Sequence, residues 1–213
     1  MEGHFTTFNV LPGGRIRGLS YHLARLTFGH RTLYGRPLPT GLVDAVSSLR
    51  EPNTYRVTCH ADSYTIDARP TPPSAPITCD FYPLTRKLPQ VKHCDLDPQW
   101  DAQRQVDADD AILVTGDLIT EGTMFNVGFI APDGSLVWPD GDLLLGTTQQ
   151  LIEEFWPSTR REIHIADVES FIGAIATNAA RGVRSITAIG ASWVPTPQGT
   201  GIAAEIARHY QCL

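Results

Sequence analysis

Lysine is rare in this sequence, and that draws attention to the two lysines it has. Of the 17 basic residues, only Lys87 and Lys92 are lysines, and the others are arginines. An amine can lose its proton and act as a nucleophile, whereas a guanidinium stays protonated. Lys92 stands between Pro89 and an expected helix, where partial loss of hydration would lower the pKa of an amine. It could then form a Schiff base with a carbonyl, or it could be an ordinary exposed loop lysine.

Other residues could hold an anionic, aromatic cofactor. Glu121 is expected between two β-segments, where its carboxylate either pairs with a pyridinium nitrogen or faces water in a turn. Thr147 and Thr148 follow Gly146 at the expected start of a helix. Their hydroxyls and the helix N–H groups either bind an anion or form a plain cap. Arg25, on a helix, either binds a phosphate through paired hydrogen bonds or extends into solvent.

Several other kinds of site are disfavoured. His60 beside Cys59 and His93 beside Cys94 lack the ligand spacing of a zinc site. Neither a G-x-S-x-G nor an H-E-x-x-H motif occurs. The net charge of −6, without a run of basic residues, argues against a nucleic-acid partner.

The composition also bears on the compartment. The apolar stretches are shorter than the ~18 residues of a membrane span, so no membrane association is expected. No basic segment followed by an apolar one opens the chain, so no secretory signal is expected. The four cysteines contain no C-x-x-C pair and are expected to be free thiols of a cytoplasmic protein.

Residue patterns predict an α+β fold in two parts. Four prolines within residues 69–76 mark a change of composition, and the boundary is expected between residues 83 and 91. This predicts a small domain of residues 1–86 and a larger, β-rich domain of residues 87–213. Ser20 is expected to cap the first helix. The other expected helices cover residues 40–49, 98–106, 146–155, 167–171 and 201–210; the strands cover residues 3–10, 54–59, 63–68, 77–82, 111–115, 118–120, 126–130, 136–139, 161–165, 173–177 and 183–189.

Short segments of the chain, taken in order, resemble the motifs of one enzyme family. Residues 3–7 look like a G-x-F-E-T strand, and residues 22–26 match an H-x-x-R-L helix. Residues 91–93 are similar to the family's lysine segment, and residues 121–126 match E-G-x-x-x-N. The remaining matches are residues 136–139, 144–148 (L-P-G-I-T in the family) and 177–182. Together they resemble the class IV (fold type IV) pyridoxal-phosphate enzymes, which include aminotransferases and aminodeoxychorismate lyases.

The resemblance implies a cofactor, pyridoxal 5'-phosphate, in the cleft between the two domains of the chain. It also implies that the protein is a homodimer. Lys92 would bind it as a Schiff base and move protons at the α-carbon of the substrate, and Glu121 would pair with the pyridine nitrogen. The other implied cofactor-binding residues are Arg25, Gly146, Thr147 and Thr148 near the phosphate, Met124 and Leu144 beside the ring, and Asn178 near the phosphate or substrate.

Three functions remain open from the sequence. The first is an aminotransferase that moves an amino group between an amino acid and a 2-oxo acid. The second is an aminodeoxychorismate lyase that forms 4-aminobenzoate and pyruvate, a branch that His93 and Asn178 favour. The third is a non-catalytic binding protein derived from this fold. Arg86 and Arg181 are the candidates for binding a substrate carboxylate.

Overall fold

The computed structural model describes residues 3–213, which form two compact units of α+β structure. The first unit contains the chain up to Pro73 together with Leu88–Leu96, and the second contains Ser74–Lys87 and Asp97–Leu213. The chain therefore passes between the units three times. The expected domains, residues 1–86 and 87–213, remain a prediction; the contacts group Lys92 with the N-terminal unit.

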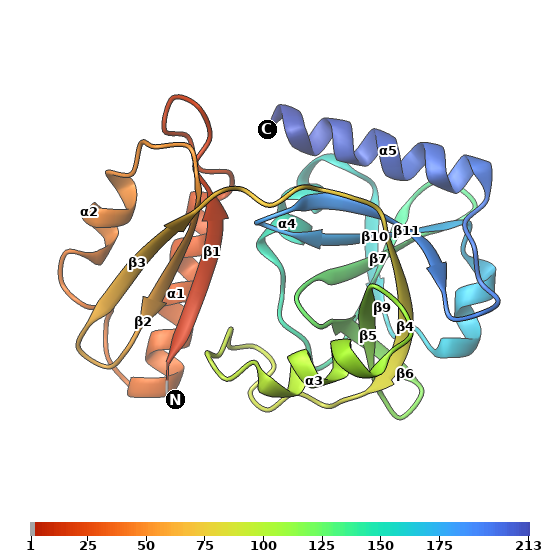
Figure 1. Cartoon of the computed structure of the whole chain (residues 1–213), viewed down its shortest axis with the longest axis horizontal. Helices are drawn as coiled ribbons and strands as arrows, with labels where there is room; N and C mark the ends of the chain where they lie inside the picture. The colour runs from red at the N-terminus through yellow and green to blue at the C-terminus, as the bar shows by residue number, and fades with distance from the viewer. Residues whose placement is uncertain (1–2) are drawn as a thin grey trace. The chain divides into compact units, whose positions relative to one another are not determined.

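The first unit is an antiparallel sheet with two helices (Figure 1). The strands, in the order β1-β2-β3, are β1 (His4–Asn9), β2 (Thr54–Cys59) and β3 (Tyr64–Arg69). The helices are α1 (Leu19–Tyr34), which contacts β1, and α2 (Leu42–Ser47). Phe8, Leu26 and Val57 are buried in the shared core. The strands have one face covered by apolar packing, which fixes their register.

The segment Leu88–Leu96 lies along the free edge of β1. The backbone N–H of Phe5 donates to the carbonyl of Lys92 at 2.9 Å, and the N–H of Cys94 donates to the carbonyl of Gly3 at 2.9 Å. An antiparallel bridge pairs His4 with His93. Strand-like hydrogen bonds thus hold the backbone of Lys92, which does not lie in a flexible loop.

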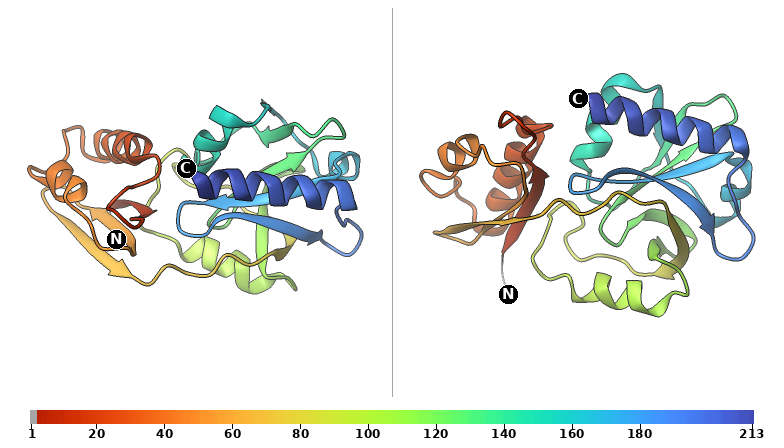
Figure 2. Two further views of the ribbon diagram at one scale, coloured as in Figure 1. Left: turned by 90° about the horizontal axis from the view of Figure 1, so that it is seen from above. Right: turned by 45° about the horizontal axis from the view of Figure 1, so that its top comes forward.

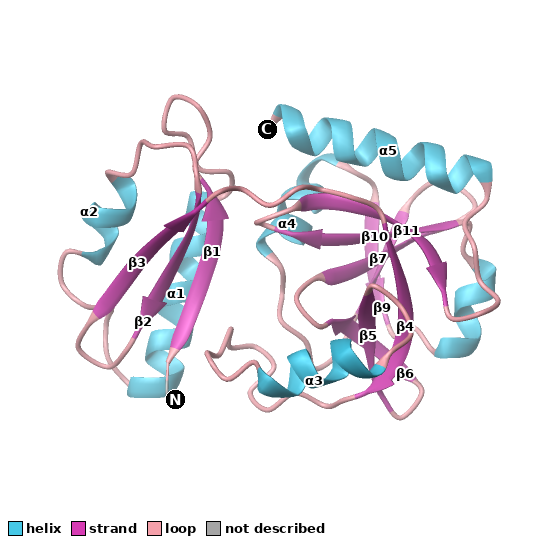
Figure 3. Cartoon of the chain, viewed as in Figure 1, coloured by secondary structure: helices cyan, strands magenta, loops and turns pink. Residues whose placement is uncertain are grey.

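The second unit is built on an eight-stranded mixed sheet (Figures 2 and 3). Its strands follow the order β6-β5-β4-β11-β10-β7-β8-β9. The long helix α5 (Pro197–Cys212) contacts β10 and β11, and α3 (Asp97–Gln105) contacts β5. The strand bounds are β4 (Ile77–Pro83), β5 (Asp110–Thr115), β6 (Leu118–Gly122), β7 (Asn126–Ile130), β8 (Leu136–Pro139), β9 (Ser158–Arg161), β10 (Gly173–Asn178) and β11 (Gly182–Ile189). The remaining helices are α4 (Thr147–Phe155) and the 3-10 helix η1 (Ile165–Ser170).

Buried apolar side chains from most of these strands form one core in the second unit. Ile112, Val127 and Ile186 are completely buried in it. The rings of Phe129 and Phe171 stack at 4.9 Å between centroids. This packing makes the sheet a rigid support for the loops at its strand ends.

Two expectations about local structure are wrong. Helix α1 begins after Gly18, which has a left-handed φ of 61°, and no side chain of the described residues caps it, so Ser20 is not the cap. Strand β9 occupies Ser158–Arg161 rather than residues 161–165, because it pairs in parallel with β8. Its polar sequence shows no apolar alternation, so the pairing could not be read from the pattern.

All four cysteines, all of them within the described residues, are free. Across residues 3–213, the helices are too short or too polar to cross a membrane.

Candidate functional site

Glu121 is a buried carboxylate at the end of β6. The residue is 5% exposed. One of its oxygens, Oε1, accepts hydrogen bonds from Nη1 of Arg86 at 2.7 Å and from the backbone N–H of Leu144 at 3.2 Å. Buried carboxylates need such partners to offset the loss of hydration. The interpretation of Glu121 as a turn residue facing water is therefore wrong.

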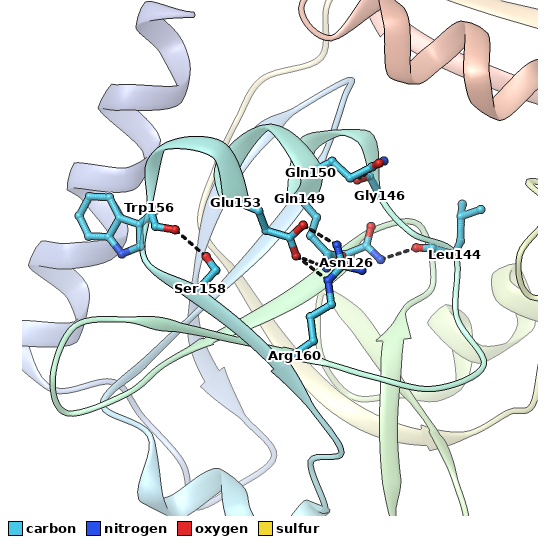
Figure 4. Close-up of polar contacts among 9 residues, drawn as sticks. All are labelled: Asn126, Leu144, Gly146, Gln149, Gln150, Glu153, Trp156, Ser158 and Arg160. Atoms are coloured by element: carbon cyan, nitrogen blue, oxygen red, sulfur yellow. Dashed lines mark hydrogen bonds and ion pairs between the residues drawn. The ribbon is translucent and has the colours of Figure 1, made fainter.

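Asn126, at the start of β7, holds the loop that leads to α4 (Figure 4). Its Nδ2 donates to the carbonyl of Leu144 at 2.7 Å. Its Oδ1 lies so close to Gly146 that a Cβ atom at that position would be 2.0 Å away. A glycine is therefore required at residue 146, and the E-G-x-x-x-N segment and the Gly-Thr-Thr segment are fitted to each other.

The N-terminus of α4 has no side-chain cap among the described residues. Gly146 is the N-cap in an extended conformation. The interpretation of Thr147 or Thr148 as a simple cap is wrong. Both threonines are buried, and Oγ1 of Thr148 lies 3.4 Å from the hydroxyl of Tyr210. Helix N–H groups beside buried hydroxyls suit a phosphate group.

A polar network ties α4 to the edge strand β9 (Figure 4). Nε2 of Gln149, which is buried, donates to Oε1 of Glu153 at 3.0 Å. Arg160 on β9 donates to the same carboxylate, with its Nε 2.8 Å from Oε1. The helix is therefore anchored at its first turn by Asn126 and further along by Glu153.

Met124 and Asn178 are neighbours in the second unit. Nδ2 of Asn178 donates to the carbonyl of Met124 at 3.1 Å. Its Oδ1 accepts from the backbone N–H groups of Ala180 at 3.2 Å and Arg181 at 2.8 Å. Asn178 thus shapes the turn between β10 and β11 and fixes the backbone of the loop after Glu121.

Lys92 and Arg25 belong to the first unit, and both are half-buried. Nζ of Lys92 lies 4.9 Å from the ring centroid of Phe5, a distance at which an ammonium is attracted to the ring. Burial lowers the pKa of His22 well below its usual value, and the positive charges of Arg25 and Lys92 lower it further. Both cations therefore lie near His22, whose Nδ1 is 2.7 Å from Oγ1 of Thr6.

The structure thus places the expected residues in two sets, one in each unit. The second unit brings together Glu121, Leu144, Gly146, Thr147 and Thr148, with Met124 and Asn178 as a further pair. The first unit holds Lys92 and Arg25, whose positive charges both act on His22. The sequence reasoning missed the pairing of Arg86 with Glu121, because the two residues are 35 positions apart and no spacing pattern links them.

The first unit also holds a histidine cluster. Nε2 of His4 lies 3.2 Å from Nδ1 of His30. Burial lowers the pKa of His4 to about 4, and the neighbouring His30, His60 and His93 add to this effect. Over residues 3–213, no group of three or more His, Cys, Asp or Glu side chains could hold a metal ion.

The residues present fit pyridoxal phosphate. A buried carboxylate suits a protonated pyridine nitrogen, the start of α4 has no side-chain cap among the described residues, and the lysine supplies an amine. None of these features requires a metal.

Comparisons with known proteins agree with this chemistry. The sequence profile described as amino-transferase class IV matches residues 3–189. A comparison with curated proteins gives no match. Among solved structures, a hypothetical aminotransferase from Mycobacterium tuberculosis in its PLP-bound form is 18% identical, with a TM-score of 0.80 over 98% of this chain and 88% of that one.

Two further solved structures share the fold. A fold IV transaminase from Curtobacterium pusillum is 19% identical, with a TM-score of 0.78 over 98% of this chain and 85% of that one. A structure named as a candidate 4-amino-4-deoxychorismate lyase from Legionella pneumophila is 18% identical, with a TM-score of 0.79 over 97% and 91%. The fold is therefore fold type IV, with a smaller N-terminal and a larger β-rich C-terminal part. The chain belongs to the class IV aminotransferase family, whose members are pyridoxal-phosphate-dependent enzymes.

Proposed function

We propose that this enzyme transfers an amino group between an amino acid and a 2-oxo acid, and that Lys92 binds the cofactor covalently. The observation that carries the proposal is Glu121, a buried carboxylate held by two donors within an E-G-x-x-x-N segment of a class IV aminotransferase. A carboxylate in this setting suits a pyridine nitrogen that must stay protonated. The bound cofactor supplies an electron sink for the substrate α-carbon.

We assign the remaining roles to this chain's own residues. Thr147, Thr148 and the first N–H groups of α4 bind the phosphate, with the guanidinium of Arg25. Met124 and Leu144 contact the ring, and Gly146, which leaves room for Asn126, lets the start of α4 take its position at the phosphate. Lys92, as a free amine, takes the proton from the substrate α-carbon and returns it. Asn178 orders the β10–β11 turn, whose backbone then faces the phosphate or the substrate.

Lyase activity toward aminodeoxychorismate is the second candidate. The similarity in fold to the Legionella pneumophila structure supports it, as do His93 beside Lys92 and Asn178 at its turn. Covalent binding and proton removal by Lys92 are common to both reactions. The two candidates therefore share these steps and differ in the substrate, in the bond that breaks and in the final place of the amino group.

The family also supports a homodimer located in the cytoplasm and acting in amino acid metabolism. Sedimentation of the purified protein would test the dimer: a mass of about twice the 23.4 kDa chain supports it, and a mass equal to one chain contradicts it.

The first experiment is to trap the cofactor on its lysine. The protein is loaded with pyridoxal phosphate, reduced with borohydride and digested, and the labelled peptide is identified by mass spectrometry. We expect the label on Lys92, no specific label in Lys92→Ala, and an unchanged label in the matched control Lys87→Ala, since Lys87 is the other lysine of the chain. Absence of cofactor binding in the wild type would contradict the proposal and favour the non-catalytic alternative.

The second experiment separates the two reactions. The loaded enzyme is given a panel of amino acids with a 2-oxo acid acceptor and, in parallel, aminodeoxychorismate. Formation of a new amino acid supports the aminotransferase. Release of pyruvate and 4-aminobenzoate without amino transfer contradicts the aminotransferase proposal and supports the lyase.

A further inference from the structure

Arg86 and Glu121 form a buried ion pair. Nη1 of Arg86 is 2.7 Å from Oε1 of Glu121, and their side chains are 8% and 7% exposed. Breaking such a pair by removing one partner is costly, because it leaves a charge without compensation away from water. Arg86 therefore supplies the opposite charge that the buried carboxylate of Glu121 needs.

Local structure holds Arg86 in place for this contact. After β4 ends, the N–H of Leu84 donates to the carbonyl of Val114 at 3.1 Å. The hydroxyls of Thr85 and Thr115 lie 2.9 Å apart. These two contacts keep the chain against β5 up to the residue before Arg86. The sheet therefore fixes the backbone next to Arg86. A side chain that positions another residue needs such a rigid support.

We propose that Arg86 is a positioning residue that holds Glu121 ionised and oriented for the pyridine nitrogen of the cofactor, an inference that rests on the proposed function. The guanidinium and the N–H of Leu144 both contact Oε1, so the orientation of the carboxylate is set from two directions. Arg86 is then engaged in the cofactor site and is not the residue that binds the substrate carboxylate.

The chemical consequence concerns one proton. An ionised Glu121 stabilises a protonated pyridine nitrogen through a charge-assisted hydrogen bond. Without the guanidinium, the buried carboxyl gains by taking up a proton, since burial disfavours its charge. A neutral carboxyl no longer favours the protonated ring. Removing Arg86 therefore lowers the protonation of the cofactor nitrogen, although Arg86 acts only through Glu121.

The test is the nitrogen-15 NMR shift of pyridoxal phosphate labelled at the ring nitrogen and bound to the protein. This shift reports ring protonation directly and requires no turnover. We expect a protonated-ring shift in wild type and in Arg86→Lys. In Arg86→Leu and Arg86→Gln we expect the nitrogen resonance to move toward the value of an unprotonated ring. We also expect the affinity for the cofactor to fall by about tenfold or more. Gln keeps hydrogen-bond donors but no charge, so it separates charge from geometry.

The matched control is Arg104→Leu, which removes an exposed arginine that pairs with Asp101. We expect it to leave the nitrogen shift and the cofactor affinity unchanged. Circular dichroism identifies variants that do not fold. If Arg86→Leu is among them, Arg86→Gln and Arg86→Lys still decide between the outcomes.

A double-mutant cycle tests that Arg86 acts through Glu121. In a Glu121→Gln background, adding Arg86→Gln should move the nitrogen shift no further. A wild-type protein that binds no cofactor would defeat the proposed function itself. A different result would overturn this inference: the wild type binds the cofactor, and Arg86→Gln has the wild-type nitrogen shift but a raised KM for the amino acid. Arg86 would then be the residue that binds the substrate carboxylate.

Discussion

Asn126 and Gly146 are fitted to each other at the start of α4, where a Cβ atom at residue 146 would lie 2.0 Å from Oδ1 of Asn126. The other end of the same amide donates to the carbonyl of Leu144. Asn126 is buried and lies at the start of β7, so it has little room to move. The position of the Gly-Thr-Thr segment is therefore set by the sheet.

Gly146→Ala should disturb this arrangement. The added methyl must displace either Asn126 or the start of α4, which we expect to lower the free energy of unfolding by about 1–3 kcal/mol. Because the phosphate is assigned to this helix start, the affinity for pyridoxal phosphate should fall as well. Chemical denaturation and cofactor titration measure the two effects.

The matched control is Gly201→Ala, within helix α5. A Cβ atom there meets no atom within 4 Å, so alanine should raise stability by about 0.5–1 kcal/mol through helix propensity. Equal effects of the two substitutions on stability and on cofactor affinity would contradict the assigned role of Gly146.

Glu153→Gln should affect stability without affecting the cofactor. The substitution removes the charge that pairs with Arg160, and Arg160 is 41% exposed, so water screens the pair. We expect a loss of about 0.2–1 kcal/mol and a cofactor affinity close to wild type, since Asn126 still holds the first turn of α4. Glu154→Gln is the neighbouring control. A large fall in cofactor affinity in Glu153→Gln alone would show that the first turn depends on β9.

Acid should weaken the protein through its buried histidines. The pKa of His4 is lowered to about 4 in the folded protein, whereas an unfolded histidine titrates near 6.5. Between these values the unfolded chain binds more protons, so the stability that neutral His4 contributes is complete above pH 6.5 and is lost as the pH falls toward 4. After allowance for solvent screening we expect a loss of roughly 1 kcal/mol between pH 7 and pH 5.

Urea denaturation at the two pH values measures this loss. His4→Gln should show a smaller difference between pH 7 and pH 5 than wild type. His209→Gln, which alters an exposed histidine on α5, should show the wild-type difference. If His4→Gln loses as much stability as wild type, another group governs the acid sensitivity.

Only one of the four thiols should react rapidly in the folded protein. Cys212 is exposed. Burial raises the pKa of Cys59 to about 12 and raises that of Cys79 as well, so neither forms the reactive thiolate at neutral pH. Titration with a chromogenic disulfide should give one fast equivalent, which Cys212→Ser removes. Burial also raises the pKa of half-buried Cys94, which should react slowly.

Much of the fold was predictable because many strands alternate or form compact apolar runs. The expected strands at residues 54–59, 126–130 and 136–139 are those of the structure. Helix α4 was also predictable from Gly146 and the apolar spacing that follows it. The class IV family was predictable from the order of the motifs.

The remainder depends on contacts that no local pattern records. Strand β9 is polar and exists because β8 pairs with it. The start of α1 depends on the left-handed backbone of Gly18 rather than on a side-chain cap. The pairing of Arg86 with Glu121 joins residues brought together only by the sheet order.

The three passages of the chain between the units have a consequence for synthesis. While the chain is on the ribosome, β1 lacks the segment Leu88–Leu96 until residue 96 has emerged, and by then β4 of the other unit is already made. The nascent N-terminal unit therefore completes the edge of its sheet only after synthesis of the C-terminal unit has begun. A gene split after residue 86 would separate Lys92 from the strand that holds its backbone, so the two halves would have to reassociate to restore that edge.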